Sequence, residues 1–330
     1  LKLFLDVNLD MNDGALITAD SVTVLLAGGT SNISNWQTQG AAYLQAPIAA
    51  TISSAISGTG DIFIINSSDL TLTGLNTYTG ITSVTSGTLT ALGAGNILPS
   101  TTTLWIDTLG LCRLDDQAVD ALYVNGDLEI SGPLTFNSGA CYDDISGSGS
   151  LIKQGSGSFT MDASCNCTLS APTTVTSGSL TVQSPLYSTE YNLSGGQVSL
   201  TQANLLPSTS SITMGSGAEL SIGGNDYTIS SLSGQGSVTA SGGALTINTA
   251  LTPGLSAGAI TICNFVLDGG ASFNVEINGG TAGTGYDQVI ATGDVTLGGS
   301  LNVTSTYTPY IGDEFVIINK TSSGPMAGAF

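Results

Sequence analysis

The sequence predicts an all-β protein folded as a β-helix, or β-solenoid, and three observations lead to this prediction. First, the composition disfavours helices, because Gly, Ser and Thr are abundant and only 8% of the 330 residues are charged. Second, long internal repeats are present, and their spacings differ by about one solenoid turn. Third, apolar and small polar residues alternate within each repeat, as in strands with one buried face.

The spacing of the repeats distinguishes a solenoid from other all-β folds. Thr82–Thr90 recurs as Thr173–Thr181 at an offset of 91 residues, and Asn96–Thr101 recurs as Asn204–Thr209 at an offset of 108. The two offsets differ by 17 residues, which is close to the length of three short strands with their turns. A stack in which each turn contacts only its neighbours accepts such an insertion. A sandwich with Greek-key connections is the alternative fold.

Strand-sized segments of the repeats alternate in polarity, as in Ser179–Val182, Gln197–Leu200 and Glu219–Ile222. A period of two places the apolar side chains on one face of each strand. Glycine pairs such as Gly195-Gly196 supply the positive φ that tight corners need. We therefore expect apolar residues to lie above one another inside the solenoid, with Ser and Thr outside.

Three regions differ in how well they match the repeat. Residues 1–50 do not match it, and their small-residue run Ala41–Leu44 is compatible with a short helix. Open solenoid ends expose unpaired backbone groups, so we predict that residues 1–50 form an N-terminal cap, with a docking segment for another copy as the alternative. Residues 51–250 are predicted to form the β-helix repeats, and residues 251–330 the C-terminal rungs, a rung being one turn of the solenoid.

The charge balance excludes several classes of partner. The net charge is −20, with four Lys and Arg residues and no His. Such a surface repels nucleic acid and anionic lipid headgroups. The longest weakly polar stretch, residues 41–56, is short for a membrane span, so we expect no membrane insertion. Asp6 and Asp10 interrupt any signal-peptide core, so we expect a mature product or a fragment of a longer protein.

The five cysteines are Cys112, Cys141, Cys165, Cys167 and Cys263. Two interpretations stay open: they are buried small apolar residues, or some of them form disulfides. The candidate disulfides are Cys112–Cys141 and a link from Cys165 or Cys167 to a neighbouring rung. Cys165 and Cys167 point to the same face of a strand, but one intervening residue is too few for an ordinary zinc site.

The sequence predicts no catalytic and no cofactor-binding residues. Gly254–Gly258 matches the G-x-S-x-G pattern of serine hydrolases, but a chain without His cannot assemble a Ser-His-Asp triad. Two adjacent carboxylate pairs, Asp115-Asp116 and Asp143-Asp144, are the remaining candidates for catalysis. Neighbours in a strand point to opposite faces, whereas glycoside cleavage needs two carboxylates facing one sugar.

No metal site is predicted either, although the loop aspartates are candidate ligands for a Ca²⁺ ion. Asp10, Asp13, Asp115 and Asp116 offer the carboxylate oxygens that Ca²⁺ prefers. The nonapeptide repeat that binds calcium in other β-solenoids does not occur. Ca²⁺ is therefore the one cofactor that we consider.

Several segments in order resemble the passenger-associated transport repeat of bacterial autotransporters, and together they cover about residues 56–320. These segments are Gly74–Gly80, Val84–Leu89, Leu251–Gly258, Gly285–Val289, Leu297–Val303 and Gly312–Ile318. The resemblance implies a right-handed parallel β-helix that is exported across the outer membrane of a Gram-negative cell. It also implies an extracellular or cell-surface location.

We therefore expect a non-enzymatic extracellular surface solenoid, structural or adhesive, that resembles an autotransporter passenger. One alternative is a self-assembling subunit of an extracellular filament or surface layer, because contacts between non-identical ends form open polymers. Another is a β-helix enzyme that acts on polysaccharides, whose activity would depend on Asp115 or Asp143. The expected partners are another copy bound end to end and a host or cell-surface ligand, but not nucleic acid.

Overall fold

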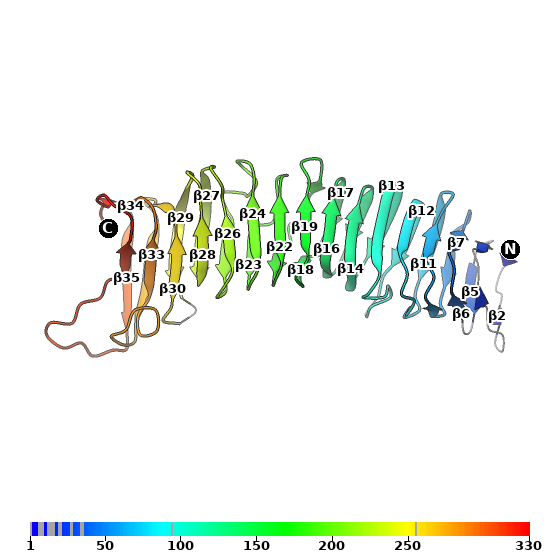
Figure 1. Cartoon of the computed structure of the whole chain (residues 1–330), viewed down its shortest axis with the longest axis horizontal. Coiled ribbons are helices and arrows are strands. Elements are labelled where there is room, and N and C mark those ends of the chain that lie inside the picture. Colours follow the sequence, from blue (N-terminus) through cyan, green and yellow to red (C-terminus); the bar gives the residue numbers. More distant parts are fainter. Residues whose placement is uncertain are drawn as a thin grey trace. The chain divides into compact units, whose positions relative to one another are not determined.

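A computed structural model describes residues 2–5, 10–11, 17–18, 22–26, 29–33, 36–93, 95–254 and 256–330. These residues form strands, turns and bends, without a helix long and apolar enough to span a membrane. The chain divides into two compact units, Leu1–Ala171 (unit 1) and Pro172–Phe330 (unit 2). Both units are parallel β-solenoids (Figure 1), so the predicted fold class is confirmed and the sandwich alternative is wrong.

Unit 1 consists of short strands that follow one another around the solenoid. They are β1 (Lys2–Leu5), β2 (Asp10–Met11), β3 (Ile17–Thr18), β4 (Val22–Leu26), β5 (Gly29–Ile33), β6 (Trp36–Thr38), β7 (Ala42–Gln45), β8 (Ala50–Ile52), β9 (Ile56–Gly58), β10 (Ile62–Ile64), β11 (Ser68–Leu72), β12 (Thr82–Ala91), β13 (Thr103–Leu114), β14 (Gln117–Val124), β15 (Asp127–Ile130), β16 (Leu134–Cys141), β17 (Asp144–Gly147), β18 (Leu151–Lys153), β19 (Ser158–Met161) and β20 (Asn166–Cys167).

These strands form three parallel ladders. Ladder A joins β1, β4, β7, β10, β12, β13, β14, β16 and β19 in that order. Ladder B joins β2, β5, β8, β11, β12, β13, β15, β17 and β20. Ladder C contains β3, β6 and β9 and later β14, β16 and β18. β12, β13, β14 and β16 each contribute to two ladders, because they bend at a corner of the solenoid.

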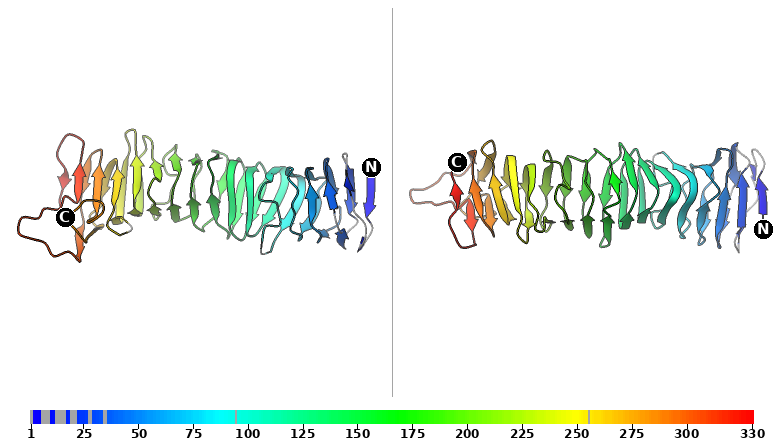
Figure 2. Two further views of the ribbon diagram at one scale, coloured as in Figure 1. Left: turned by 60° about the horizontal axis from the view of Figure 1, so that its bottom comes forward. Right: turned by 90° about the horizontal axis from the view of Figure 1, so that it is seen from above.

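Unit 2 has the same construction. Its strands are β21 (Thr173–Val175), β22 (Ser179–Val182), β23 (Glu190–Leu193), β24 (Gln197–Leu200), β25 (Ser211–Met214), β26 (Glu219–Ser221), β27 (Tyr227–Gly234), β28 (Gly236–Thr239), β29 (Ala244–Pro253), β30 (Ala259–Ile262), β31 (Asn264–Leu267), β32 (Ser272–Ile277), β33 (Gln288–Ala291), β34 (Val295–Leu297), β35 (Ser300–Ser305), β36 (Ile318–Lys320) and β37 (Ala327–Gly328). Figure 2 shows these strands beside one another from two further directions.

The core of each unit consists of columns of apolar side chains. In ladder B the parallel register aligns Leu89, Cys112, Leu128, Ile145 and Cys167, and all five are buried. Each member packs on the one above and the one below, so one column removes a continuous apolar surface from water. The expectation of apolar residues aligned inside the solenoid is confirmed for this ladder.

Unit 2 has equivalent columns. The register of β24, β26, β28 and β30 aligns Val198, Leu220, Val238 and Ile262, which are all buried. The alternate residues of the same strands, such as Ser199 and Ser221, point outward and are half-buried. Strand alternation therefore separates the apolar and hydroxyl residues in this unit too.

Glycine is required where one strand turns a corner. Gly139 lies in the middle of β16, where the strand passes from ladder C to ladder A, and its φ is 129°. A Cβ atom at this position would collide with the backbone carbonyl oxygen of Leu122 in the neighbouring rung. Only glycine combines this φ with such a close approach of two backbones.

The short helix considered for Ala41–Leu44 is wrong. β7 (Ala42–Gln45) is a strand that lies between β4 and β10 in ladder A. Ala42 and Leu44 are buried while Tyr43 is half-buried, which is the alternation of a strand. Small residues have weak preferences for helix or strand, so pairing with a strand on each side determines their conformation. The proposed cap role of residues 1–50 stays a prediction.

We predict that the interior columns supply most of the stability of unit 1. Replacing Leu128, which is fully buried in β15, with Ala should lower the free energy of unfolding by about 2–5 kcal/mol, because it leaves a cavity in the column. Replacing Leu109, which is 77% exposed, with Ala should change it by about 0.5 kcal/mol or less. Denaturant unfolding followed by circular dichroism checks both values, and equal effects of the two substitutions would contradict the assignment of the core.

Candidate functional site

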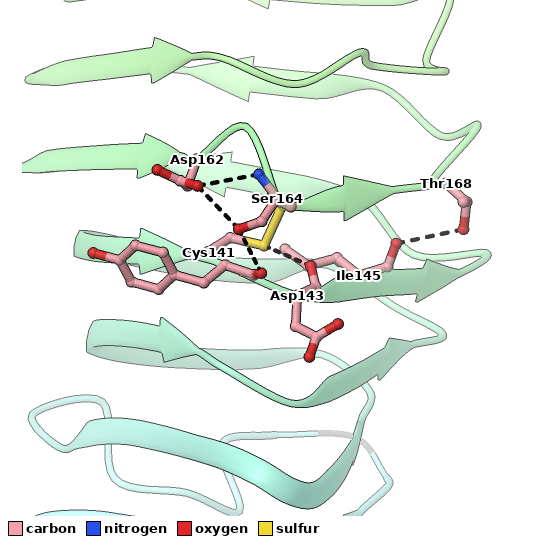
Figure 3. Close-up of a disulfide and its surroundings, with 8 residues drawn as sticks. Cys141, Asp143, Ile145, Asp162, Ser164 and Thr168 are labelled. Atoms are coloured by element: carbon pink, nitrogen blue, oxygen red, sulfur yellow. Dashed lines mark hydrogen bonds between the residues drawn. A yellow bond between two sulfur atoms is a disulfide. The ribbon is translucent and has the colours of Figure 1, made fainter.

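A disulfide joins Cys141 to Cys165 in unit 1 (Figure 3). Cys141 is the last residue of β16, and Cys165 lies in the turn between β19 and β20. Because β16 and β19 are neighbours in ladder A, the bond joins adjacent rungs. The two Cα atoms are 5.5 Å apart, and the bond closes a segment with a sequence separation of 24 residues.

The turn that carries Cys165 is held by hydrogen bonds from both sides. The backbone N–H of Cys165 donates to the carbonyl oxygen of Asp162 at 2.9 Å. The Ser164 hydroxyl lies 2.9 Å from Oδ1 of Asp162, and it lies 2.8 Å from the carbonyl oxygen of Tyr142 in the preceding rung. Sγ of Cys141 lies 3.0 Å from the carbonyl oxygen of Asp143, which is a packing contact because a disulfide sulfur carries no proton.

The observed disulfide differs from one of the two pairings considered from the sequence. Cys112–Cys141 is wrong, because Cys112 lies in the interior column of ladder B whereas Cys141 lies in ladder A between Val124 and Met161. The Cys141–Cys165 bond is of the other kind considered, a link between neighbouring rungs. Cys165 and Cys167 are both buried, with the exposed Asn166 between them.

The other three cysteines are free and buried. Burial raises the pKa of the Cys112 thiol far above its usual range and that of Cys167 to about 11. Burial also raises the pKa of Cys263. Since the thiolate is the reactive form, these protonated thiols are poor nucleophiles and poor metal ligands at neutral pH. They pack as small apolar residues.

Three carboxylates meet on the outside of ladder B, next to the disulfide. One carboxylate oxygen each from Asp127, Asp143 and Asp144 lies within 4.8 Å of the others. Asp127 begins β15, Asp144 begins β17, and Asp143 lies in the bend before β17. Figure 3 shows the Asp143 side chain extending away from the disulfide.

The expectation that Asp143 and Asp144 point to opposite faces is wrong. Strand alternation does not apply to Asp143, because this residue precedes the strand. The cluster also follows from the length of a rung. Asp127 and Asp144 are 17 residues apart, which equals the difference between the two repeat offsets in the sequence. That spacing is the sequence signal that could have revealed the cluster.

The cluster concentrates negative charge. Loss of hydration, followed by the charges of Asp143, Asp144 and Glu129, raises the pKa of Asp127. Three carboxylates at this separation offer oxygen ligands of the type that Ca²⁺ accepts. Exposed acidic groups also lie close together on proteins that bind no ion there, and they then repel one another.

The aspartates considered as Ca²⁺ ligands lie elsewhere. Asp115 and Asp116 lie between β13 and β14, and Asp10 begins β2, whereas Asp13 lies outside the described residues. The group of three carboxylates identified among the described residues includes none of them. The structure therefore places the concentrated negative charge of unit 1 on residues that the sequence argument did not select for a metal.

A shallow groove of about 290 Å³ lies beside the cluster. Its charged wall is the ion pair in which Nε of Arg113 donates to Oε2 of Glu129 at 2.8 Å. Ser146 occupies the next position of the same ladder, and serine hydroxyl groups share the rest of the wall with apolar side chains such as Leu114 and Ile130. Both members of the ion pair are nearly half exposed, so the pair contributes little to stability. The groove offers hydrogen-bonding groups but no proton-transfer pair.

Gly258, the last residue of the G-x-S-x-G match in unit 2, is bound by a buried carboxylate. The backbone N–H of Gly258 donates to Oδ1 of Asp287 at 2.8 Å, and the N–H of Glu276 donates to Oδ2 at 2.8 Å. The side chain of Asp287 is buried, and loss of hydration raises its pKa despite these hydrogen bonds. Asp287 therefore joins two parts of the chain, a role that sequence reasoning did not identify.

We predict that the disulfide stabilises unit 1. The double substitution Cys141→Ser and Cys165→Ser should lower the free energy of unfolding by about 3 kcal/mol, as expected for a closed loop of this length. Thermal unfolding with and without dithiothreitol provides the measurement, because reduction should destabilise the wild type but not the variant. Cys263→Ala is the matched control and should retain the response to dithiothreitol. A wild type that is insensitive to reduction would contradict the disulfide.

We also predict a pH-dependent effect of Asp127. Because the pKa of Asp127 is raised in the folded state, folding favours the protonated carboxyl group. The stability that this protonated group contributes is complete below 3.8, its pKa in the unfolded chain, and is lost as the pH rises through its pKa in the folded state. Asp127→Asn should therefore raise the melting temperature at pH 7 and have little effect near pH 3. The exposed Asp268→Asn is the control. A variant that is less stable at pH 7 would show that the cluster is not repulsive.

Comparison with models of protein families and with curated proteins finds no match to this chain. The main features of the described residues are the disulfide between rungs, the buried protonated thiols, and the acidic cluster beside the groove that Arg113 and Glu129 line.

Proposed function

We propose that this chain is a non-enzymatic segment of an extracellular surface protein, where its solenoid units serve a structural or adhesive role. The observation that carries the proposal is the Cys141–Cys165 disulfide between neighbouring rungs. Disulfides persist outside the reducing cytosol, and they are rare in proteins that stay inside it. The resemblance of the repeats to autotransporter passengers supports the same location.

The outer surface of the solenoid is consistent with this role. In unit 2, Thr181, Ser199, Ser221 and Thr239 occupy successive outward positions of one ladder. Rows of hydroxyl groups and a net charge of −20 keep such a surface hydrated and soluble. The interior columns of buried apolar side chains meanwhile hold the strands in place.

Two pairs of outward aromatic residues support the adhesive part of the proposal. Tyr43 stacks on Phe63 with ring centroids 5.0 Å apart, and Trp105 stacks on Tyr123 at 4.7 Å. All four lie in one outward column of ladder A, with Ser83 between the two pairs. Aromatic residues held in place by their neighbours are common anchors at protein interfaces.

The non-enzymatic part of the proposal is supported by the state of the thiols and of three cationic side chains among the described residues. The chain has no histidine, and the free thiols are buried. Arg113 pairs with Glu129, Lys153 donates to the carbonyl oxygens of Gln154 and Gly155, and Lys320 donates to Ser322 and Ser323. The ion pairs of the described residues, Arg113–Glu129 and Lys320–Asp294, include none of the three clustered aspartates, and an acidic cluster by itself is not an acid–base pair.

Surface exposure on producing cells tests the proposal. Protease treatment of intact cells should remove the chain while a cytosolic marker stays intact. Mass spectrometry of alkylated protein should show Cys141 and Cys165 joined, with Cys112, Cys167 and Cys263 as thiols. A chain that is degraded only after lysis, with all five cysteines alkylated without reduction, would refute the extracellular location.

A further inference from the structure

A polar hollow of about 320 Å³ lies between two loops of unit 2 that belong to successive rungs. One loop, residues 201–210, joins β24 to β25, and the other, residues 222–226, joins β26 to β27. Six residues line the hollow: Asn204, Leu206, Ser208, Asp226, Tyr227 and Thr228. A volume of this size is at the lower end of the range for small-molecule sites, so the hollow has room for one ring-sized ligand.

Hydrogen bonds hold both loops in place around the hollow. The hydroxyl of Tyr227, at the start of β27, donates to the carbonyl oxygen of Gln202, which ties the first loop to the next rung. On the second loop, Oδ1 of Asp226 accepts the backbone N–H of Ala244 at 2.9 Å, which fixes the orientation of the carboxylate. Groups that are already held in place lose little entropy when they bind a ligand.

The two copies of an internal repeat use their first asparagine differently. In the copy Asn96–Thr101, Oδ1 of Asn96 accepts the backbone N–H of Ala118 at 2.6 Å, which is a structural role. In the copy Asn204–Thr209, the equivalent Asn204 is exposed and lines the hollow. Its φ is 61°, a left-handed value that Asn tolerates better than most residues. The amide that supports the neighbouring rung in one copy therefore faces a hollow in the other.

The lining matches an uncharged ligand that carries several hydroxyl groups. The Asp226 carboxylate accepts hydrogen bonds, the Asn204 amide both donates and accepts them, and the hydroxyls of Ser208 and Thr228 do either. Each hydroxyl group of a sugar is likewise both a donor and an acceptor, so neighbouring sugar hydroxyls satisfy this set. The half-buried Leu206 offers an apolar surface to the C–H groups of a sugar ring.

Other classes of ligand fit the hollow less well. None of its six lining residues is cationic and the net charge is −20, so a phosphate, sulfate or uronate would be repelled. Ca²⁺ takes about six to eight oxygen ligands and favours several carboxylates, whereas a single carboxylate lines this hollow. A peptide that adds a strand needs a free sheet edge, but β25 and β27 each pair with a strand on both sides.

We propose that this hollow binds one uncharged sugar ring of a glycan, with Asp226 and Asn204 as its main hydrogen-bond partners. The inference rests on the adhesive role proposed above, for which it supplies a ligand and a site. Asn204, Ser208, Asp226 and Thr228 are all exposed, so the rest of the glycan extends from the hollow into solvent. The site lies within unit 2 and needs no contribution from unit 1.

Isothermal titration calorimetry of the purified chain tests the proposal. The probes are four uncharged trisaccharides, maltotriose, cellotriose, mannotriose and galactotriose, which differ in linkage and in hydroxyl orientation. At least one of them should bind with a stoichiometry of one per chain. Trigalacturonate, a trisaccharide that carries carboxylates, should not bind, because Asp226 repels it.

Three variants locate the binding. Asp226→Asn keeps an oxygen for the backbone hydrogen bond but removes the charged acceptor, and it should weaken binding about tenfold. Asn204→Gly accepts the left-handed φ and removes the amide, with a similar loss. Ser208→Trp should fill the hollow and abolish binding. Asp268→Asn and Ser216→Trp make the same changes at exposed positions of unit 2 outside the hollow, and they should bind like the wild type.

Melting temperatures equal to that of the wild type show that the variants are folded. The proposal is overturned if none of the four uncharged trisaccharides binds, if trigalacturonate or a trilysine peptide binds more tightly than all of them, or if the three variants of the hollow bind like the wild type. A chain that binds a trisaccharide but is degraded only after cell lysis would refute the surface location and leave this site intact. A surface-exposed chain that binds none of them would refute the site alone.

Discussion

The parallel hydrogen-bonded ladder is the constraint on which the rest of the structure depends. Because each strand pairs with the strand one rung before and one rung after, every residue lies beside a residue of the same orientation in both neighbours. An inward position is therefore apolar in most rungs, with exceptions such as the buried Lys153 in register with Phe136, and an outward position can be polar in every rung. This repetition explains why Leu128, Ile145 and Cys167 share one buried column although they are far apart in sequence.

The same register produces the chemically distinctive region of unit 1. Asp127 and Asp144 are brought together because they begin strands in successive rungs, and the bend before β17 adds Asp143. The adjacent corner places Cys141 next to Cys165. The acidic cluster and the disulfide thus arise from one structural cause, the alignment of rungs at a corner. The local effects differ: one concentrates charge and the other covalently joins two rungs.

A ladder also creates a problem that a closed fold avoids. Its edge strands retain unpaired backbone groups, and its core side chains retain an uncovered side. In unit 2 this uncovered side includes Leu301 and Val303, whose equivalents in the preceding rung are fully buried. The burial of an inward side chain therefore depends on the rungs on both sides of it, and not on its own strand alone.

The sequence by itself determined the solenoid, because period-two alternation and repeat offsets differing by 17 residues are properties of the chain. It also determined the absence of a Ser-His-Asp site, since no His is present. Tertiary structure decided that Ala42–Gln45 is a strand, that Cys141 bonds to Cys165 rather than Cys112, and that Asp143 and Asp144 face the same way. The physical reason is that these outcomes depend on where each strand begins and which ladder it joins. Corners and neighbouring rungs set both, and local residue preferences do not specify them.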